Sequence, residues 1–179
     1  MVKLSRVFWL LVFFAILRGH ASAQYMIPSP LPQGPLTYHG PNGEVPIPPL
    51  FQAVIRKDAQ RVGALLTQGA DANEMCPCGT SPLEAAVSQV KDARIADLLL
   101  AYGADPNRRT PKNVKGSTNE WTPLFYAIYD RRAELVSLLL RYHAKTDLVD
   151  VQGKTPLQWA RERKASDIVA LLQRAGVKR

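Results

Sequence analysis

The 179-residue chain has few of the residue types from which catalytic and metal sites are built. It contains 2 cysteines and 3 histidines. Two cysteines cannot form a disulfide framework, and a Cys-x-Cys pair alone supplies too few ligands for zinc. It also lacks a phosphate-binding glycine loop, a nucleophile elbow and a paired His–Glu metal motif. We therefore expect no catalytic residues, no metal and no cofactor in its folded part.

Long hydrophobic runs are also missing. The longest apolar run, Val7–Leu17, has 11 residues, whereas a membrane span needs about 20. Two basic residues precede this run and the small residues Ala21–Ala23 follow it, which is the layout of a secretory signal peptide. We expect residues 1–23 to be cleaved and the protein to be exported, with the periplasm favoured over the extracellular space. No stable membrane span would then remain.

The excess of positive charge is modest after this processing. The net charge of +8 falls to +5, because three basic residues lie within 1–23. A basic surface suits nucleic acid, membranes or acidic proteins. Export disfavours nucleic acid, so we expect a protein partner and a solvated basic face.

Proline is concentrated in one stretch. Eight of the 14 prolines lie between Pro28 and Pro49. Residues 24–46 are rich in proline and glycine and lack helical periodicity. We expect them to form an extended arm.

The rest of the chain repeats itself. Pro-Leu recurs at spacings of 33, 41 and 33 residues, and a Gly-Ala-Asp-like marker follows each copy after 20 or 21 residues, preceded by a leucine block. Repeats of this length indicate a stacked array. The four Pro-Leu pairs begin at Pro49, Pro82, Pro123 and Pro156.

Each repeat carries the signals of a helix pair. Ser81, Thr122 and Thr155 place a hydroxyl at a helix N-cap directly before proline, where the hydroxyl can accept from an unpaired amide. The second helix carries the leucine block and ends at glycine, or at His143 in the third repeat. We therefore expect residue 143 to have a positive φ. The prediction is an all-α solenoid of about four helix-turn-helix repeats, at residues 47–78, 79–119, 120–152 and 153–179.

These motifs together resemble the ankyrin repeat, over about residues 47–179. The histidine that usually follows Pro-Leu in that family is replaced by Phe51, Glu84, Phe125 and Gln158. The connection between the second and third repeats is longer by seven residues, and one further residue lies between the two helices of the second repeat.

The resemblance implies a partner surface made of the tips of the loops that join successive repeats, which we call fingers, and of the inner face of the first helices. We expect Trp121 to point outward and to form an aromatic anchor with Tyr129; the alternative is that Trp121 packs on the long loop beside it. The positions carried over by their offset from Pro-Leu are Cys78, Thr80, Ser88, Gln89, Thr118, Asn119, Trp121, Tyr129, Asp130, Val151, Gln152 and Lys154.

Cys76 and Cys78 are separated by one proline. In an exported protein they can form a local disulfide if their Cα atoms lie within about 7 Å. They can equally remain two free thiols or pair with another chain. An exposed bridge of this kind would be open to reduction.

The sequence as a whole therefore predicts an exported, monomeric, non-enzymatic module that binds another protein. One alternative is an inhibitor or immunity protein that neutralises an exported hydrolase or toxin. A second alternative is a redox-linked stress protein that uses Cys76 and Cys78.

Overall fold

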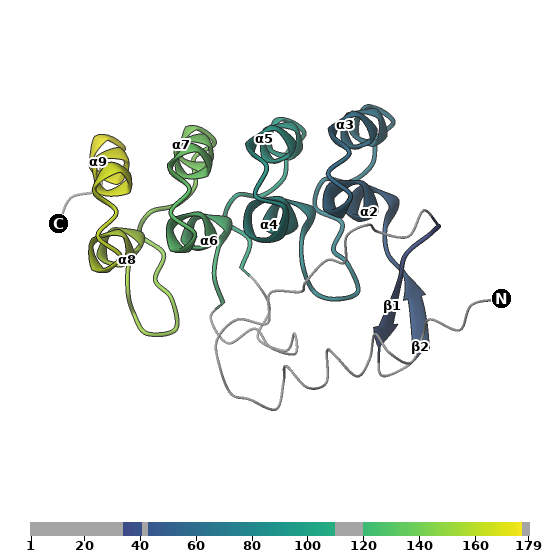
Figure 1. Ribbon diagram of the computed structural model, residues 1–179, viewed down its shortest axis with the longest axis horizontal. Helices are drawn as coiled ribbons and strands as arrows, with labels where there is room; N and C mark the ends of the chain where they lie inside the picture. The colour runs from purple at the N-terminus through teal and green to yellow at the C-terminus, as the bar shows by residue number, and fades with distance from the viewer. Residues whose placement is uncertain (1–33, 41–42, 110–119, 177–179) are drawn as a thin grey trace.

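The structure is a computed structural model that describes residues 34–40, 43–109 and 120–176. In these ranges four helix pairs stand side by side in one row, with the first helices in one layer and the second helices in another (Figure 1). This confirms the predicted helical solenoid. The first helices are α2 (Pro49–Ile55), α4 (Pro82–Ala85) continued by η1 (Ala86–Val90), α6 (Pro123–Tyr129) and α8 (Pro156–Glu162). The second helices are α3 (Ala59–Thr67), α5 (Ala93–Ala101), α7 (Ala133–Arg141) and α9 (Ser166–Arg174).

Proline begins each first helix, as expected, but the caps before it differ. Ser81 Oγ accepts from the Glu84 amide at 3.1 Å. Thr155 and Gln158 form a complete capping box, in which each side chain accepts from the other's backbone amide. The prediction for Thr122 was wrong: its buried hydroxyl makes no cap hydrogen bond. The Phe125 amide donates instead to the Thr122 carbonyl at 3.0 Å.

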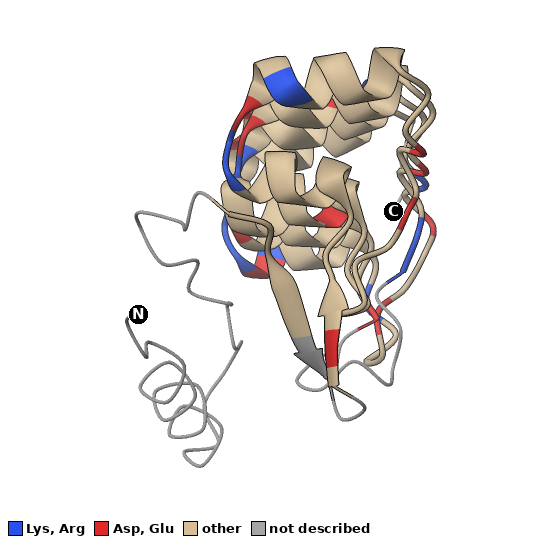
Figure 2. Cartoon of the chain, turned by 90° about the vertical axis from the view of Figure 1, so that its right-hand side faces the viewer, with Lys and Arg blue, Asp and Glu red and all other residues tan. Residues whose placement is uncertain are grey.

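Each first helix ends in a left-handed residue that is basic rather than glycine. Lys57, Lys91, Arg131 and Lys164 have φ between 53° and 57°. After three of them the next amide closes the turn onto the helix, as in Asp58 N to Ala53 O at 3.1 Å, which is the Schellman arrangement. A positive side chain near the carbonyl end of a helix is favourable. Figure 2, which looks along the row, shows charged residues at the turns on its left edge.

The extra residue of the second repeat is absorbed inside its first helix. The chain passes from α4 into the π-helical turn η1 before it reaches Lys91. A π-helical turn accommodates one residue more than an α-helical turn. The turn to α5 therefore keeps its left-handed residue, and the insertion does not shift the rest of the row.

Second helices end as the sequence predicts. Gly69, Gly103 and Gly176 have positive φ, and His143, which stands in the equivalent place, has φ 60°. The His143 prediction is therefore confirmed. A β-carbon at this backbone position costs conformational energy that glycine avoids.

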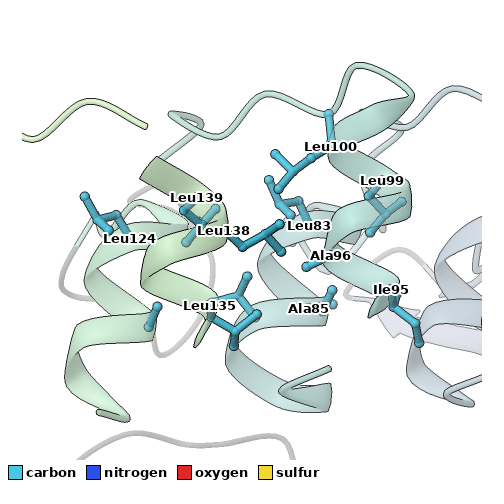
Figure 3. Packing of buried hydrophobic residues seen from close by; sticks show 14 of the residues in the cluster. Leu83, Ala85, Ile95, Ala96, Leu99, Leu100, Leu124, Leu135, Leu138 and Leu139 are labelled. Carbon is cyan, nitrogen blue, oxygen red and sulfur yellow. The ribbon is translucent and has the colours of Figure 1, made fainter. Parts of the chain in front are cut away.

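The core lies between the two helix layers and between neighbouring repeats. Leu83, Leu99, Leu135 and Leu139 are at most 1% exposed, and Figure 3 shows such side chains meeting between the second and third repeats. Small residues such as Ala85 in the first helices have no exposed surface. One helix pair cannot bury this apolar surface alone, so stacking stabilises the array.

The fingers between repeats are linked by asparagines. Asn73 donates to the Gly103 carbonyl at 2.8 Å and accepts from the Asp105 amide at 2.9 Å. Asn107, its equivalent one repeat later, accepts from the Lys145 amide at 2.7 Å. These bonds hold each finger at a defined distance from the next.

The arm departs from an all-α fold. Strands β1 (Thr37–Gly40) and β2 (Gly43–Pro46) pair antiparallel, with Tyr38 opposite Val45. The hairpin lies on the finger side of the first-helix layer (Figures 1 and 2). The Asn-Gly pair at positions 42–43 is a hairpin signal that the proline content concealed.

The predicted signal peptide, residues 1–23, lies outside the described residues. In the part of the chain that the structure describes, no helix combines the length and apolarity that a membrane crossing requires.

Candidate functional site

The finger of the fourth repeat is built around Asp150. Its Oδ1 accepts from the amides of Gln152 at 2.9 Å and Lys154 at 2.8 Å. Burial alone would raise the pKa of Asp150. These two amides, the Trp159 indole and the charge of Lys154 outweigh burial and lower that pKa below its usual value. The carboxylate therefore stays charged and keeps the finger closed.

Asp150 also ties this finger to helix α8. Trp159, on α8, donates from Nε1 to Asp150 Oδ2 at 2.8 Å. The indole is thereby held on the inner face, by which we mean the side of the first-helix layer that faces the fingers. This hydrogen bond fixes the orientation of the ring on that side.

Four aromatic residues gather around Trp121, at the entry to α6. Its ring centroid lies 5.1 Å from Tyr129 and 5.3 Å from Trp159. The other two members are Phe125 and Tyr126, at 6.3 Å and 5.2 Å. Ring pairs at these separations contribute beyond their buried area. We call Trp121, Phe125, Tyr126, Tyr129 and Trp159 the aromatic cluster.

Two cations cover this cluster on its open side. The guanidinium carbon of Arg163 lies 4.1 Å from the centroid of Tyr129, and Lys154 Nζ lies 5.5 Å from that of Trp159. Lys154 also pairs with Glu162 at 2.7 Å. Arg163 Nε is buried and has no hydrogen-bond partner among the residues described. Tyr129, Trp159 and Arg163 are all half-buried, so part of each remains accessible.

At the other end of the row, the chain's own arm occupies the inner face. Gln52, on α2, accepts from the Leu36 amide at 3.2 Å and donates to the Ile47 carbonyl at 2.7 Å. Arg56, one turn later, donates to the Gly34 carbonyl. Two side chains of the first repeat therefore hold an extended segment of backbone.

Two of the predicted surface residues are buried, which corrects the sequence-based expectation. Trp121 is 6% exposed rather than outward-facing, because four other aromatic rings enclose it. One of these rings, Trp159, comes from the next repeat, and most of the long loop of the alternative interpretation lies outside the described residues. Thr80 is 4% exposed, because it sits beneath its finger, where its carbonyl accepts from Cys76.

The other predicted positions that the structure describes are more exposed than Thr80 and Trp121. Asp130 is half-buried and pairs with Lys91 at 3.0 Å; Ser88 Oγ donates to the Glu84 carbonyl at 2.8 Å. Val151, 51% exposed, is at the finger tip. Thr118 and Asn119 lie outside the described residues. Gln89, Cys78 and Lys154 are half-buried, and Gln152 is exposed beside Val151.

Sequence reasoning missed Trp159 and Arg163. Trp159 lies on α8 and Arg163 is the C-cap residue of that helix, three and seven residues after Pro156. Asp130 was predicted from its place seven residues after Pro123, and Arg163 has the same place after Pro156. The repeat pattern therefore contained a signal for Arg163. The structure brings together Tyr129, Lys154, Trp159 and Arg163 over the buried Trp121.

The side chains of this arrangement suit contact with another protein. No group of three or more His, Cys, Asp or Glu residues gathers as a metal site in the ranges that the structure covers. The aromatic and cationic side chains at the inner face are of the types that dominate protein interfaces.

Comparison with known proteins agrees with the fold. The ankyrin repeat model matches residues 78–111, and the model for three copies of ankyrin repeats matches residues 110–178.

Individual relatives match over different shares of their length. An ankyrin repeat protein of fowlpox virus is 34% identical over 110 residues, which are 62% of this chain and 17% of the viral protein. The phosphate system positive regulatory protein of Saccharomyces cerevisiae is 39% identical over 62 residues, 35% of this chain and 5% of that protein. The chain thus spans less than a fifth of the length of either of these two proteins. Cyclin-dependent kinase 4 inhibitor B of Mus musculus is 30% identical over 126 residues, 70% of this chain and 91% of that protein.

Proposed function

The chain belongs to the ankyrin repeat family, and we propose that it is a non-enzymatic protein-binding module of the cell envelope. Its binding surface is the inner face and finger of the last two repeats. The observation that carries this proposal is the aromatic cluster under Arg163 and Lys154. Trp, Tyr and Arg are the residue types most enriched at interface hot spots.

This surface is pre-organised for binding. Trp121 fixes Tyr129 and Trp159 from below, and Asp150 fixes the Trp159 indole from the side. Side chains that are already ordered lose little entropy when a partner binds. The guanidinium of Arg163, half-buried against the ring of Tyr129, favours a partner that brings a carboxylate to it.

The location in the envelope rests on the sequence of residues 1–23. A basic start, an apolar core and the Ala21–Ala23 exit support export, with the periplasm ahead of the extracellular space. We expect the mature, monomeric chain to begin at Gln24. The intact mass of the protein recovered from the envelope tests this, and a mass that includes residues 1–23 would contradict it.

A second candidate is an inhibitor or immunity protein acting on an exported hydrolase or toxin. The mouse relative is named as an inhibitor of a kinase, and the match covers 91% of it. An inhibitor can therefore consist almost entirely of a repeat array of this length. Self-intoxication of a deletion strain supports this candidate, and a deletion strain unharmed by the cognate enzyme contradicts it.

The experiment begins with capture of the partner. The mature chain is immobilised, envelope extract is passed over it, and the protein retained is identified, purified and titrated by calorimetry. We expect Trp159→Ala and Arg163→Ala each to raise the Kd at least about 10-fold, because hot-spot truncation costs more than about 1.4 kcal/mol.

Controls lie on the other helix layer. Tyr102 is 47% exposed at the end of α5, and Arg141 is exposed at the end of α7. Tyr102→Ala and Arg141→Ala should leave the Kd within about 2-fold. An unchanged Kd for both test variants, with their melting curves intact, would remove the inner face of the last two repeats as the binding surface.

A further inference from the structure

The fingers of the second and fourth repeats contain the same turn. Cys76 and Asp150 each lie six residues before a helix-starting proline. The Cys76 amide donates to Thr80 O at 3.0 Å, as the Asp150 amide donates to Lys154 O at 3.0 Å. Gly79 and Gly153 close the two turns with φ of 81° and 75°.

The side chains of Cys76 and Asp150 accept one equivalent hydrogen bond in these turns. Asp150 Oδ1 accepts from the Gln152 amide at 2.9 Å. Cys76 Sγ accepts from the Cys78 amide, the equivalent of Gln152, at 3.1 Å. The sulfur of Cys76 therefore occupies the place that holds a carboxylate two repeats later.

Cys76 is joined to Cys78 by a disulfide, with 5.0 Å between their Cα atoms. The two sulfurs differ in access: Cys76 is 3% exposed, whereas Cys78 is half-buried and follows the exposed Pro77. A thiolate from solution can thus approach Cys78 more readily than Cys76.

We propose that Cys76–Cys78 is a thiol–disulfide exchange site, attacked at Cys78, with Cys76 as the leaving group. Its substrate class is a small thiol or dithiol. The Cys78 amide, which donates to Cys76 Sγ, stabilises a thiolate on Cys76, just as the equivalent amide stabilises the carboxylate of Asp150. A stabilised thiolate leaves faster. This exchange needs no protein partner, so it can be measured on the chain alone.

The exchange balances in two steps. A reductant thiolate attacks Cys78 Sγ, forms a mixed disulfide and breaks the Cys78–Cys76 bond, whose electron pair leaves on Cys76. Cys76 then takes a proton from water. A second reductant thiol attacks the mixed disulfide and releases the thiol of Cys78, so that the protein disulfide is reduced and two reductant thiols are oxidised.

The first test asks which sulfur is attacked. The folded, oxidised full-length mature chain is treated briefly with limiting glutathione, free thiols are trapped with iodoacetamide, and the peptide is mapped by fragment mass spectrometry. We expect glutathione on Cys78 and the alkyl group on Cys76, at least 10-fold over the reverse. Equal or reversed labelling would overturn the proposal. So would failure of the folded chain to react while the urea-unfolded chain does.

The second test asks whether the sulfur occupies a carboxylate position. The double variant Cys76→Asp, Cys78→Gln rebuilds the finger of the fourth repeat. We expect its melting temperature to lie within about 3 °C of the oxidised wild type and to be unchanged by dithiothreitol. Cys76→Leu with Cys78→Gln is the matched control, apolar and without an acceptor, and should melt lower. A Leu variant as stable as the Asp variant would show that residue 76 needs only a side chain of sufficient size and no hydrogen-bond acceptor. That result would overturn the assignment of the Cys76 sulfur to a carboxylate position.

Discussion

The two ends of the row use equivalent inner-face positions in different ways. Gln52 and Arg56 lie three and seven residues after Pro49, as Trp159 and Arg163 do after Pro156. In the first repeat these side chains bond to the backbone of the chain's own arm. In the fourth they contact aromatic rings and leave part of their surface to solvent.

The two ends of the array therefore present different chemical groups on the inner face. Gln52 recognises main-chain amide and carbonyl groups, which any extended segment offers. Trp159 and Arg163 present ring faces and a guanidinium, which select partners by side chain. The end covered by the arm is therefore a structural cap, and the end with the aromatic cluster is the binding surface that we propose. Three measurements test this division.

The largest effect is expected at the centre of the open end. Trp121→Ala removes the ring that four other aromatic rings surround, and we expect the free energy of unfolding to fall by about 3–5 kcal/mol. Urea denaturation followed by circular dichroism measures the loss. Tyr102→Ala, on the outer layer, should cost less than about 1 kcal/mol. A similarly small loss for Trp121→Ala would mean that the cluster does not support the surface.

The helices themselves could be predicted because their signals are local. Proline at the first helical position, the leucine block and the residue at its end all lie within one repeat. The left-handed backbone at His143 followed from the same alignment, since only its neighbours along the chain decide it.

The burial of Trp121 could not be predicted in this way. It depends on Trp159, 38 residues later in the chain, and an offset within one repeat says nothing of the next repeat's side chain. The contact of Leu36 with Gln52 likewise joins the arm to a helix across 16 residues. Such contacts are decided by which surfaces meet, and local periodicity contains no information on them.

A smaller effect is expected at the covered end. Gln52→Ala removes one bond to the Leu36 amide and one to the Ile47 carbonyl, and we expect a loss of about 1–3 kcal/mol. Hydrogen exchange at the Leu36 amide should become at least 10-fold faster. Gln60→Ala, at an exposed position on α3, is the control and should change neither. If the Leu36 amide stays protected from exchange in Gln52→Ala, contacts other than those of Gln52 hold the arm on the first repeat.

The smallest effect concerns the charge that holds the open end together. The pKa of Asp150 is lowered from its usual 3.8, so its carboxylate stabilises the folded state fully above about pH 3.8. That contribution is lost as the pH falls through the lower folded value. Asp150→Asn keeps an acceptor oxygen but not the charge, and should be less stable by about 1 kcal/mol at pH 7.

Because the wild type loses this charge in acid, the gap between the two proteins should close below pH 3.8, the usual pKa of an aspartate. Asp147→Asn, at an exposed position before the finger, controls for the general effect of removing a carboxylate. Urea titrations from pH 7 to pH 3, followed by tryptophan fluorescence, measure the gap. A gap that stays constant over this range would show that the charge of Asp150 does not stabilise the end of the row that carries the aromatic cluster.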